Sequence, residues 1–271
     1  MSSRRRILVS QAFSEGCTES GATPDWQHGL PALRHAQQVS CLLSLDPLPP
    51  IRCMAATRAY PNLNAEKALI WRIIHRDNLP WILDNGLHCA NGGFRSPAWV
   101  SIGNQDLIDK RAMHPVPKPP GGYLNDYVPF YFTPFSPMLR NINTGWGGVR
   151  RRTNEEIVIL VSSLRHIATN GWPFLFTDSH AYYAWSNYYT DLADLDKIDW
   201  PILQARDFKR DQDDPAKFER YQAEALIHRH LPISGLIGIV CYTEEMKQNI
   251  ERQVEIRCLQ LQVHARSGWY F

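Results

Sequence analysis

The sequence lacks the features of a metal-stabilised, secreted or membrane-spanning protein. Its six cysteines form no C-x-x-C pair and no histidines stand at zinc-finger spacing, so we expect a reduced protein without a structural metal. No run approaches about 18 consecutive apolar residues, which argues against a transmembrane helix. The basic start Arg4–Arg6 resembles a signal peptide, but Ser14–Gly16 cuts its apolar region short. We therefore predict a cytoplasmic protein that does not contact a membrane.

An excess of one charge is also missing. The net charge is +2 over 271 residues, which by itself does not indicate a nucleic-acid-binding protein. Any contact with DNA must come from a local basic patch, for which Arg140, Lys110–Arg111 and Arg150–Arg152 are candidates, while Asp211–Asp214 is an opposing acidic run. Such runs are more often a solvated face, so both interpretations stay open.

The glycine fingerprint of a Rossmann domain and internal repeats are absent as well. Apolar, β-branched segments are interspersed with short helical ones, without a regular βαβ rhythm. We expect strands at 69–74, 127–132, 157–161, 174–176, 236–240 and 256–263. We expect helices at 78–85, 105–113, 164–169, 180–195 and 199–206, and another that starts at 243. This order predicts an α/β (α+β) fold with a mixed central sheet and short helices.

The stretch from 115 to 145 has the strongest local pattern. A Pro/Gly run at 115–122 predicts a stiff loop, and the aromatic segment at 127–132 predicts a strand. Pro129 favours an edge position or a bulge for this strand, because proline cannot donate to a ladder. Ser136–Pro137 predicts the start of a helix that Gly145 ends. The aromatics can be core residues or a stacking platform for a flat ligand.

This stretch also carries a resemblance to a known family. The run KPPGGYLNDYVPFYFTPFSPML at 118–139 is similar to the motif of DarT, the toxin of a toxin–antitoxin pair. Stretches at 74–79, 157–163, 176–180 and 222–224 resemble the same family in the right order, and the match spans about 69–242. The resemblance implies an ADP-ribosyltransferase-like fold that moves ADP-ribose from NAD⁺ to a base in single-stranded DNA.

The first 65 residues lie outside this resemblance. Residues 1–53 show little periodicity, whereas Met54 begins a sequence, MAAT, that is plausible as a protein start. We expect 1–53 to be a poorly ordered extension or a mispredicted start, followed by a DarT-like transferase domain at 54–271.

Glu224 is the first candidate for catalysis. Small and apolar neighbours in Tyr221–Ile227 would bury its carboxylate, and burial of a charge is expensive. A glutamate on a helix surface is the alternative. By the resemblance, Glu224 accepts a hydrogen bond from the nicotinamide-ribose hydroxyl and stabilises the oxocarbenium-like centre that forms as nicotinamide departs. It is not expected to act as a nucleophile.

Arg111 is the second candidate, with solvent exposure as the alternative. In the DarT family, the arginine before the Pro/Gly run contacts NAD⁺ and is assigned the activation of the target base. A guanidinium is a poor general base, because its pKa lies above about 12. We expect Arg111 to bind polar groups of NAD⁺ and to stabilise a deprotonating base through its planar fork. A water or Glu224 could then take the proton.

The resemblance implies further NAD⁺ contacts at Arg72, Ile73, Ile74, Trp81 and His88. The family holds the nicotinamide amide by the backbone of the first strand, which often reads His-Ile-Thr-His, so Arg72 and Ile74 are departures. His180 resembles the family's histidine near the DNA, although an exposed histidine at a helix start is an equal alternative.

Seven aromatic residues lie within 185–221, shortly before Glu224. In transferases of this fold, a loop before the glutamate selects the acceptor. Aromatics there can stack unpaired bases at about 1–3 kcal/mol each, although core packing is the simpler account of most of them.

The sequence thus indicates a toxin-type, NAD⁺-dependent DNA ADP-ribosyltransferase. Single-stranded DNA is the expected partner, and the family implies an antitoxin ADP-ribosyl hydrolase of macrodomain type. A transferase of the same fold that acts on RNA or protein is one alternative, and a catalytically silent nucleic-acid-binding module is another. The choice between thymine and guanine, the sequence context and the oligomeric state stay open.

Overall fold

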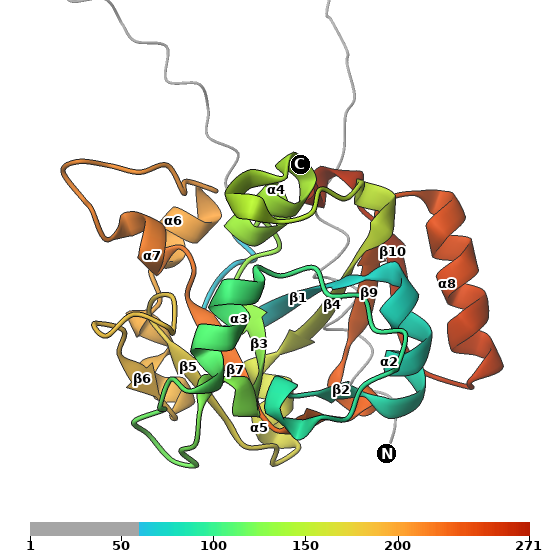
Figure 1. Cartoon of the computed structure of the whole chain (residues 1–271), viewed down its shortest axis with the longest axis horizontal. Helices are drawn as coiled ribbons and strands as arrows, with labels where there is room; N and C mark the ends of the chain where they lie inside the picture. Colours follow the sequence, from blue (N-terminus) through green and yellow to red (C-terminus); the bar gives the residue numbers. More distant parts are fainter. Residues whose placement is uncertain (1–59) are drawn as a thin grey trace, which may run out of the picture. The chain divides into compact units, whose positions relative to one another are not determined.

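A computed structural model of the chain describes residues 60–271 (Figure 1). The expected extension at 1–53 and the expected start at Met54 lie outside the described residues. Within the described part, no helix is long and apolar enough to cross a membrane.

An eight-stranded mixed sheet organises the protein, in the order β10-β9-β4-β1-β3-β7-β5-β6. Its strands pair antiparallel except for β9 and β10, which are parallel. The strands are β1 (Leu69–His75), β3 (Tyr127–Tyr131), β4 (Ile157–Ser163), β5 (Phe174–Thr177), β6 (Tyr188–Tyr189), β7 (Glu224–His228), β9 (Gly238–Cys241) and β10 (Gln262–Ala265). A separate two-stranded sheet joins β2 (Leu87–His88) to β8 (His230–Leu231). This architecture confirms the expected mixed α/β fold.

The core follows the continuous apolar runs of the sequence. All seven residues of β4 are buried, and β1 lies beside it near the middle of the sheet, as an unbroken β-branched run predicts. Short helices surround the sheet: α2 (Leu79–Asn85), α3 (Gln105–Ala112), α4 (Pro137–Thr144), α5 (Leu164–Thr169), α6 (Trp200–Gln204), α7 (Lys217–Arg220) and α8 (Glu244–Ile256). Figure 1 shows α8 beside β9 and β10, and α6 and α7 at the opposite end of the sheet.

Several predicted helix ends are confirmed by their capping contacts. The Ser136 hydroxyl accepts a hydrogen bond from the backbone N–H of Leu139, and Gly145 closes α4 with a positive φ of 79°. Ser163 and Thr243 cap α5 and α8 in the same way. These signals lie within a few residues of the backbone groups that they satisfy, which explains why the sequence predicts them.

Two predicted elements are wrong. Residues 180–195 do not form a helix, because side chains bind the backbone there and β6 pairs with β5 instead. Residues 256–263 are not one strand. The helix α8 continues to Ile256, and only 262–265 form a strand. The parallel pairing of β9 with β10 needs a crossover, and α8 supplies it.

Of the two alternatives predicted for the aromatic strand, an edge position or a bulge, the edge position is wrong. Strand β3 lies between β1 and β7, with a full ladder to β7 but a single residue pair, Trp71 with Tyr131, to β1. Pro129 has no partner residue on β1 in the sheet. Instead, Nη1 of the Arg72 side chain donates to the Pro129 carbonyl at 2.7 Å. Proline is therefore tolerated inside the sheet where two strands have already separated.

Candidate active site

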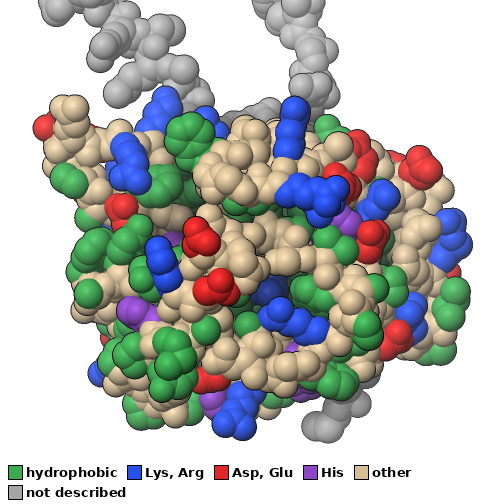
Figure 2. Space-filling model, in the orientation of Figure 1, with side chains coloured by type: hydrophobic (Ala, Val, Ile, Leu, Met, Phe, Trp, Pro, Cys, Tyr) green, Lys and Arg blue, Asp and Glu red, His purple; other side chains and the backbone are tan. Residues whose placement is uncertain are grey.

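One pocket brings together most of the residues that the sequence singles out. Of the predicted site residues, Arg72, Ile73, Ile74, His88, Arg111, His180 and Glu224 line it. The separation of β1 from β3 forms its floor, and the segment 99–108 before and within α3 forms a wall. Figure 2 shows Lys and Arg side chains in and below the hollow in the middle of this face, and Asp and Glu side chains to its left.

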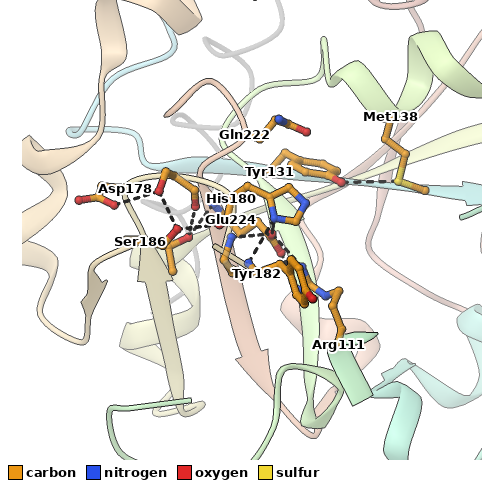
Figure 3. A network of polar contacts seen from close by, with 12 residues as sticks. Arg111, Tyr131, Met138, Asp178, His180, Tyr182, Ser186, Gln222 and Glu224 are labelled. Atoms are coloured by element: carbon orange, nitrogen blue, oxygen red, sulfur yellow. Dashed lines mark hydrogen bonds and ion pairs between the residues drawn. The ribbon is translucent and has the colours of Figure 1, made fainter. Parts of the chain in front are cut away.

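Arg111 and Glu224 form a buried, bidentate ion pair in this pocket (Figure 3). The Nη1 and Nη2 atoms of Arg111 donate to the two carboxylate oxygens of Glu224 at 2.9 and 2.8 Å. Arg111 lies in the last turn of α3, and Glu224 is the first residue of β7. Neither is solvent-exposed, so the alternatives of a surface arginine and a helix-surface glutamate are both excluded.

Packing holds each member of the pair in place. Asn125 lies just before β3 and donates through Nδ2 to the carbonyl of Ile108, which ties α3 to the sheet. Glu224 pairs with Tyr131 in the β3–β7 ladder, and its backbone N–H donates to the hydroxyl of Thr177 on β5. The carboxylate is thus built onto the sheet, whereas the guanidinium approaches it from a helix.

Both groups of the pair are ionised. Burial acts to raise the pKa of Glu224, but the charge and hydrogen bonds of Arg111, with the N–H of Ala181, outweigh it and lower that pKa below its ordinary value. Burial likewise acts to lower the pKa of Arg111, and the charge of Glu224 raises it instead. Arg111 is therefore a permanent cation in this site and cannot act as a proton acceptor.

His180 adjoins the pair in its neutral form. Its Nδ1 lies 3.6 Å from Oε1 of Glu224 and accepts a hydrogen bond from the backbone N–H of Tyr182 at 3.2 Å. Burial is the main cause that lowers the pKa of His180. Since Nδ1 accepts, the neutral ring carries its proton on Nε2. The neighbouring Ala181 N–H donates to Glu224 Oε1 at 3.1 Å, so this loop supports the carboxylate directly.

Arg72 places a second, half-buried guanidinium in the pocket. Its one hydrogen bond goes from Nη1 to Pro129, and no group among residues 60–271 binds its buried Nε atom. Burial lowers the pKa of Arg72 to about 10, so it stays charged near neutral pH. An unsatisfied buried donor is rare in proteins and indicates a position that a ligand can complete.

Trp81 lies behind the pocket wall instead of lining it. Its ring meets the rings of His88 and Trp99, which do line the pocket, at 5.7 and 5.8 Å between centroids. His88 is held by the carbonyl of Asn85 at 3.1 Å and stacks on His230. Trp81 therefore supports two lining residues.

The sequence reasoning missed Tyr131, which lines the pocket beside Glu224. Burial and the charge of Glu224 raise its pKa to about 12, so it is a neutral donor, and its hydroxyl lies 3.5 Å from Sδ of Met138. Strand alternation could have found it, because Tyr127, Pro129 and Tyr131 all line the pocket at a spacing of two.

The residues of the predicted basic patches have different partners in the structure. Arg111 is buried against Glu224, whereas Arg151 donates to the carbonyl of Asn143 and Arg152 pairs with Glu156. Two arginines of the triple run are thus engaged within the protein. Among the described residues, no group of three or more His, Cys, Asp or Glu side chains could hold a metal ion.

Comparison with known proteins agrees with this geometry. Residues 71–271 match the family model described as "ssDNA thymidine ADP-ribosyltransferase, DarT". The DNA ADP-ribosyl transferase of Escherichia coli O127:H6 is 67% identical over 210 residues, which cover 78% of this chain and 96% of that protein. Its counterpart in Thermus sp. (strain 2.9) is 35% identical over 222 residues, 79% of this chain and 99% of that protein.

Solved structures show the same fold. The Thermus sp. 2.9 DarT in complex with ADP-ribosylated ssDNA matches with a TM-score of 0.70 at 31% identity, covering 79% of this chain and 100% of that one. The same Thermus protein in complex with NAD⁺ matches with a TM-score of 0.66 at 32% identity, covering 76% and 98%. With its buried Arg–Glu pair and this similarity over nearly the full length of its relatives, the chain belongs to the DarT family of single-stranded DNA ADP-ribosyltransferases.

Proposed function

We propose that this protein transfers the ADP-ribose of NAD⁺ to a thymidine base in single-stranded DNA. The observation that carries the proposal is the ionised Arg111–Glu224 pair in a pocket that also holds Arg72 and His180. The family description supports thymidine as the acceptor, and the Thermus complexes support NAD⁺ and DNA as substrates.

The charge of the pocket suits NAD⁺. Three arginines line it against one carboxylate: Arg72, Arg95 and Arg111 against Glu224. An excess of positive charge around a pocket favours an anionic ligand, and a dinucleotide brings a diphosphate. The separated edge of β1 offers the backbone of Ile73 and Ile74 to the nicotinamide amide, and the free Nε of Arg72 can donate to a ligand oxygen.

Glu224 would promote the departure of nicotinamide. Its carboxylate is charged and held rigidly, so it can accept a hydrogen bond from the nicotinamide-ribose hydroxyl and stabilise positive charge at the anomeric carbon. The glycosidic bond breaks with its electron pair on nicotinamide. A ring nitrogen of the base then forms the new bond to the anomeric carbon.

The acceptor base must lose a proton in this step. Thymidine has one ring nitrogen that is not bound to its sugar, N3, and this nitrogen carries the proton. Arg111 would stabilise the negative charge that develops on the base, and the Nε2–H of neutral His180 would donate to a base carbonyl. The Glu224 carboxylate or a water would take the proton.

The biological setting follows from the same chemistry. A bulky adduct on a base edge blocks base pairing, so the product would stop replication, as expected of a toxin. We infer a cytoplasmic location, where NAD⁺ and DNA are both available. We also infer an antitoxin of macrodomain type that hydrolyses the base–ribose bond.

Mass spectrometry of oligonucleotides incubated with NAD⁺ and the full chain tests the proposal. We expect a gain of one ADP-ribose on single strands that contain thymidine, none on thymidine-free strands and none on duplexes. Glu224→Ala should abolish the gain, whereas the control Asp214→Ala, which removes an exposed carboxylate, should keep it. A gain on a thymidine-free strand that contains guanine would refute the base assignment. If NAD⁺ binds and no DNA is modified, the acceptor is RNA or protein. If NAD⁺ does not bind, the chain is a silent module.

A further inference from the structure

The segment between β5 and β6, residues 178–187, carries aromatic rings that the proposed reaction does not use. The ring of Tyr183 meets His180 edge to face at 5.4 Å between centroids, and it stacks on Trp185 at 4.6 Å with 11° between the ring planes. The inner end of this series lies at the reactive carboxylate, because His180 contacts Glu224. The outer end, Trp185, is 61% exposed. A path of ring contacts therefore leads from Glu224 to solvent.

This segment is held rigidly although it contains no helix. The carboxylate of Asp178 accepts hydrogen bonds from the backbone N–H and the side-chain amide of Asn187, at 3.1 and 2.8 Å. The Ser186 hydroxyl donates to the carbonyl of His180 at 2.7 Å, and the Tyr188 hydroxyl donates to the carbonyl of Ala181 at 2.5 Å. Figure 3 shows Asp178 and Ser186 to the left of His180 and Glu224, which lie together. The backbone that carries Tyr183 and Trp185 is thus fixed before any ligand binds, which lowers the entropic cost of binding.

A Trp with one covered face and one open face is a stacking surface. Tyr183 covers one face of Trp185, and more than half of the residue stays in water, which is unusual for so large an apolar group. Single-stranded DNA brings unpaired bases, each with two apolar faces. Given the transferase function proposed above, we propose that Trp185, supported by Tyr183, stacks a nucleobase next to the acceptor base in the bound DNA strand.

The surroundings favour a DNA base over the adenine of NAD⁺. Trp185 does not line the pocket in which Arg72, Arg95 and Arg111 gather. A separate groove adjoins the segment, lined by Lys118, Ser186, Asn187 and Tyr189. Lys118 can take a phosphate there, but Asp194 lines the same groove and offsets its charge. Base stacking should therefore provide most of the binding energy at Trp185, so that the affinity for DNA there should depend little on salt.

The test compares Trp185→Ala with Trp185→Phe and with Trp146→Ala, which removes another exposed Trp, on the loop after α4. In the full chain, Trp185→Ala should raise the KM for a single-stranded oligonucleotide about 5- to 150-fold and leave the KM for NAD⁺ unchanged. Trp185→Phe, which keeps a flat ring, should stay within about fivefold of the native KM. Trp146→Ala should change neither KM. An unchanged oligonucleotide KM for Trp185→Ala, or an equal rise in the KM for NAD⁺, would overturn the proposal.

Abasic substitutions in the oligonucleotide identify the stacked base. Removal of the base beside the acceptor should weaken binding to the native protein and make no further difference to Trp185→Ala. An equal loss of binding in the native protein and in Trp185→Ala would contradict base stacking on Trp185. Fluorescence anisotropy with a labelled oligonucleotide and no NAD⁺ gives this result without any transfer. If Trp185→Ala weakens oligonucleotide binding but no ADP-ribose is transferred, the proposed reaction is wrong and base stacking on Trp185 still holds. If Trp185→Ala leaves binding unchanged, base stacking on Trp185 is wrong.

Discussion

Two arginine forks in this protein share their hydrogen-bond geometry and differ in their surroundings. Arg111 binds both carboxylate oxygens of Glu224 at 2.9 and 2.8 Å, and Arg220 binds both of Asp214 at 2.8 and 2.6 Å. The side chains of the first pair are 9% and 3% exposed, whereas those of the second are 32% and 40% exposed. Hydrogen-bond distances alone do not distinguish a reactive ion pair from a structural one. The exposed fraction of the two side chains does.

The difference in burial gives the two forks different roles. Arg220 lies at the end of α7 and also binds Asp199, the N-cap of α6, so it joins two helices at the surface where water screens the charges. The Arg111–Glu224 pair is buried away from bulk water, where the same charges exert a much stronger field on a bound ligand. Only the buried fork can stabilise charge in a transition state.

Removal of each arginine should give the largest contrast between the forks. We expect Arg111→Ala to lower the free energy of unfolding by about 3–5 kcal/mol at pH 7, because the charge of Glu224 is left buried without its partner. Arg220→Ala should lower it by at most about 1 kcal/mol. Urea denaturation measures both values. Equal losses would show that burial does not distinguish the two forks.

Arg72 tests whether the pocket, and not only the ion pair, is built for NAD⁺. We expect Arg72→Ala to raise the KM for NAD⁺ about 10- to 150-fold, because a charged donor to the ligand contributes about 1.5–3 kcal/mol. Arg252→Ala, at an exposed position on α8, is the matched control and should have no effect. Arg72→His, which places a residue frequent in the family, should give an intermediate value. An unchanged KM in Arg72→Ala would mean that this arginine only holds Pro129.

The pH dependence of the free energy of unfolding should also differ between the two arginine–carboxylate pairs, by a smaller amount. The pKa of His180 is lowered in the fold, so the unfolded chain takes up a proton first and stability declines as the pH falls below about 6.5. The pKa of Glu224 is also lowered, so its contribution is present above its ordinary value of 4.5 and is lost as the pH falls further.

Variants assign these two steps. His180→Asn should remove the decline that begins near pH 6.5, and Glu224→Gln should reduce the one below pH 4.5. Asp214→Asn should change the acid limb less, and about 1 M salt should suppress its effect, because that carboxylate is exposed. Urea titrations at each pH give the slopes. A decline near pH 6.5 that persists in His180→Asn would contradict the assignment.

Much of the secondary structure could be predicted, because its signals are local. The continuous apolar run of β4 and the serine caps of α4 and α5 act on backbone groups a few residues away. The segment 180–195 was mispredicted because its conformation depends on hydrogen bonds from Ser186 and Tyr188 and on pairing with β5. The residue types of the segment contain no record of those contacts.

The sequence by itself determined the family, the expected mixed sheet and the identity of the two charged residues at the centre of the site. Only the tertiary structure decided that Arg111 and Glu224, 113 residues apart, bind each other, and that β1 and β3 separate at Pro129 to admit Arg72. The physical reason is the distance along the chain over which each interaction acts. Backbone preferences and caps act over one or two turns, whereas the register of strands and the burial of charge depend on how distant segments pack.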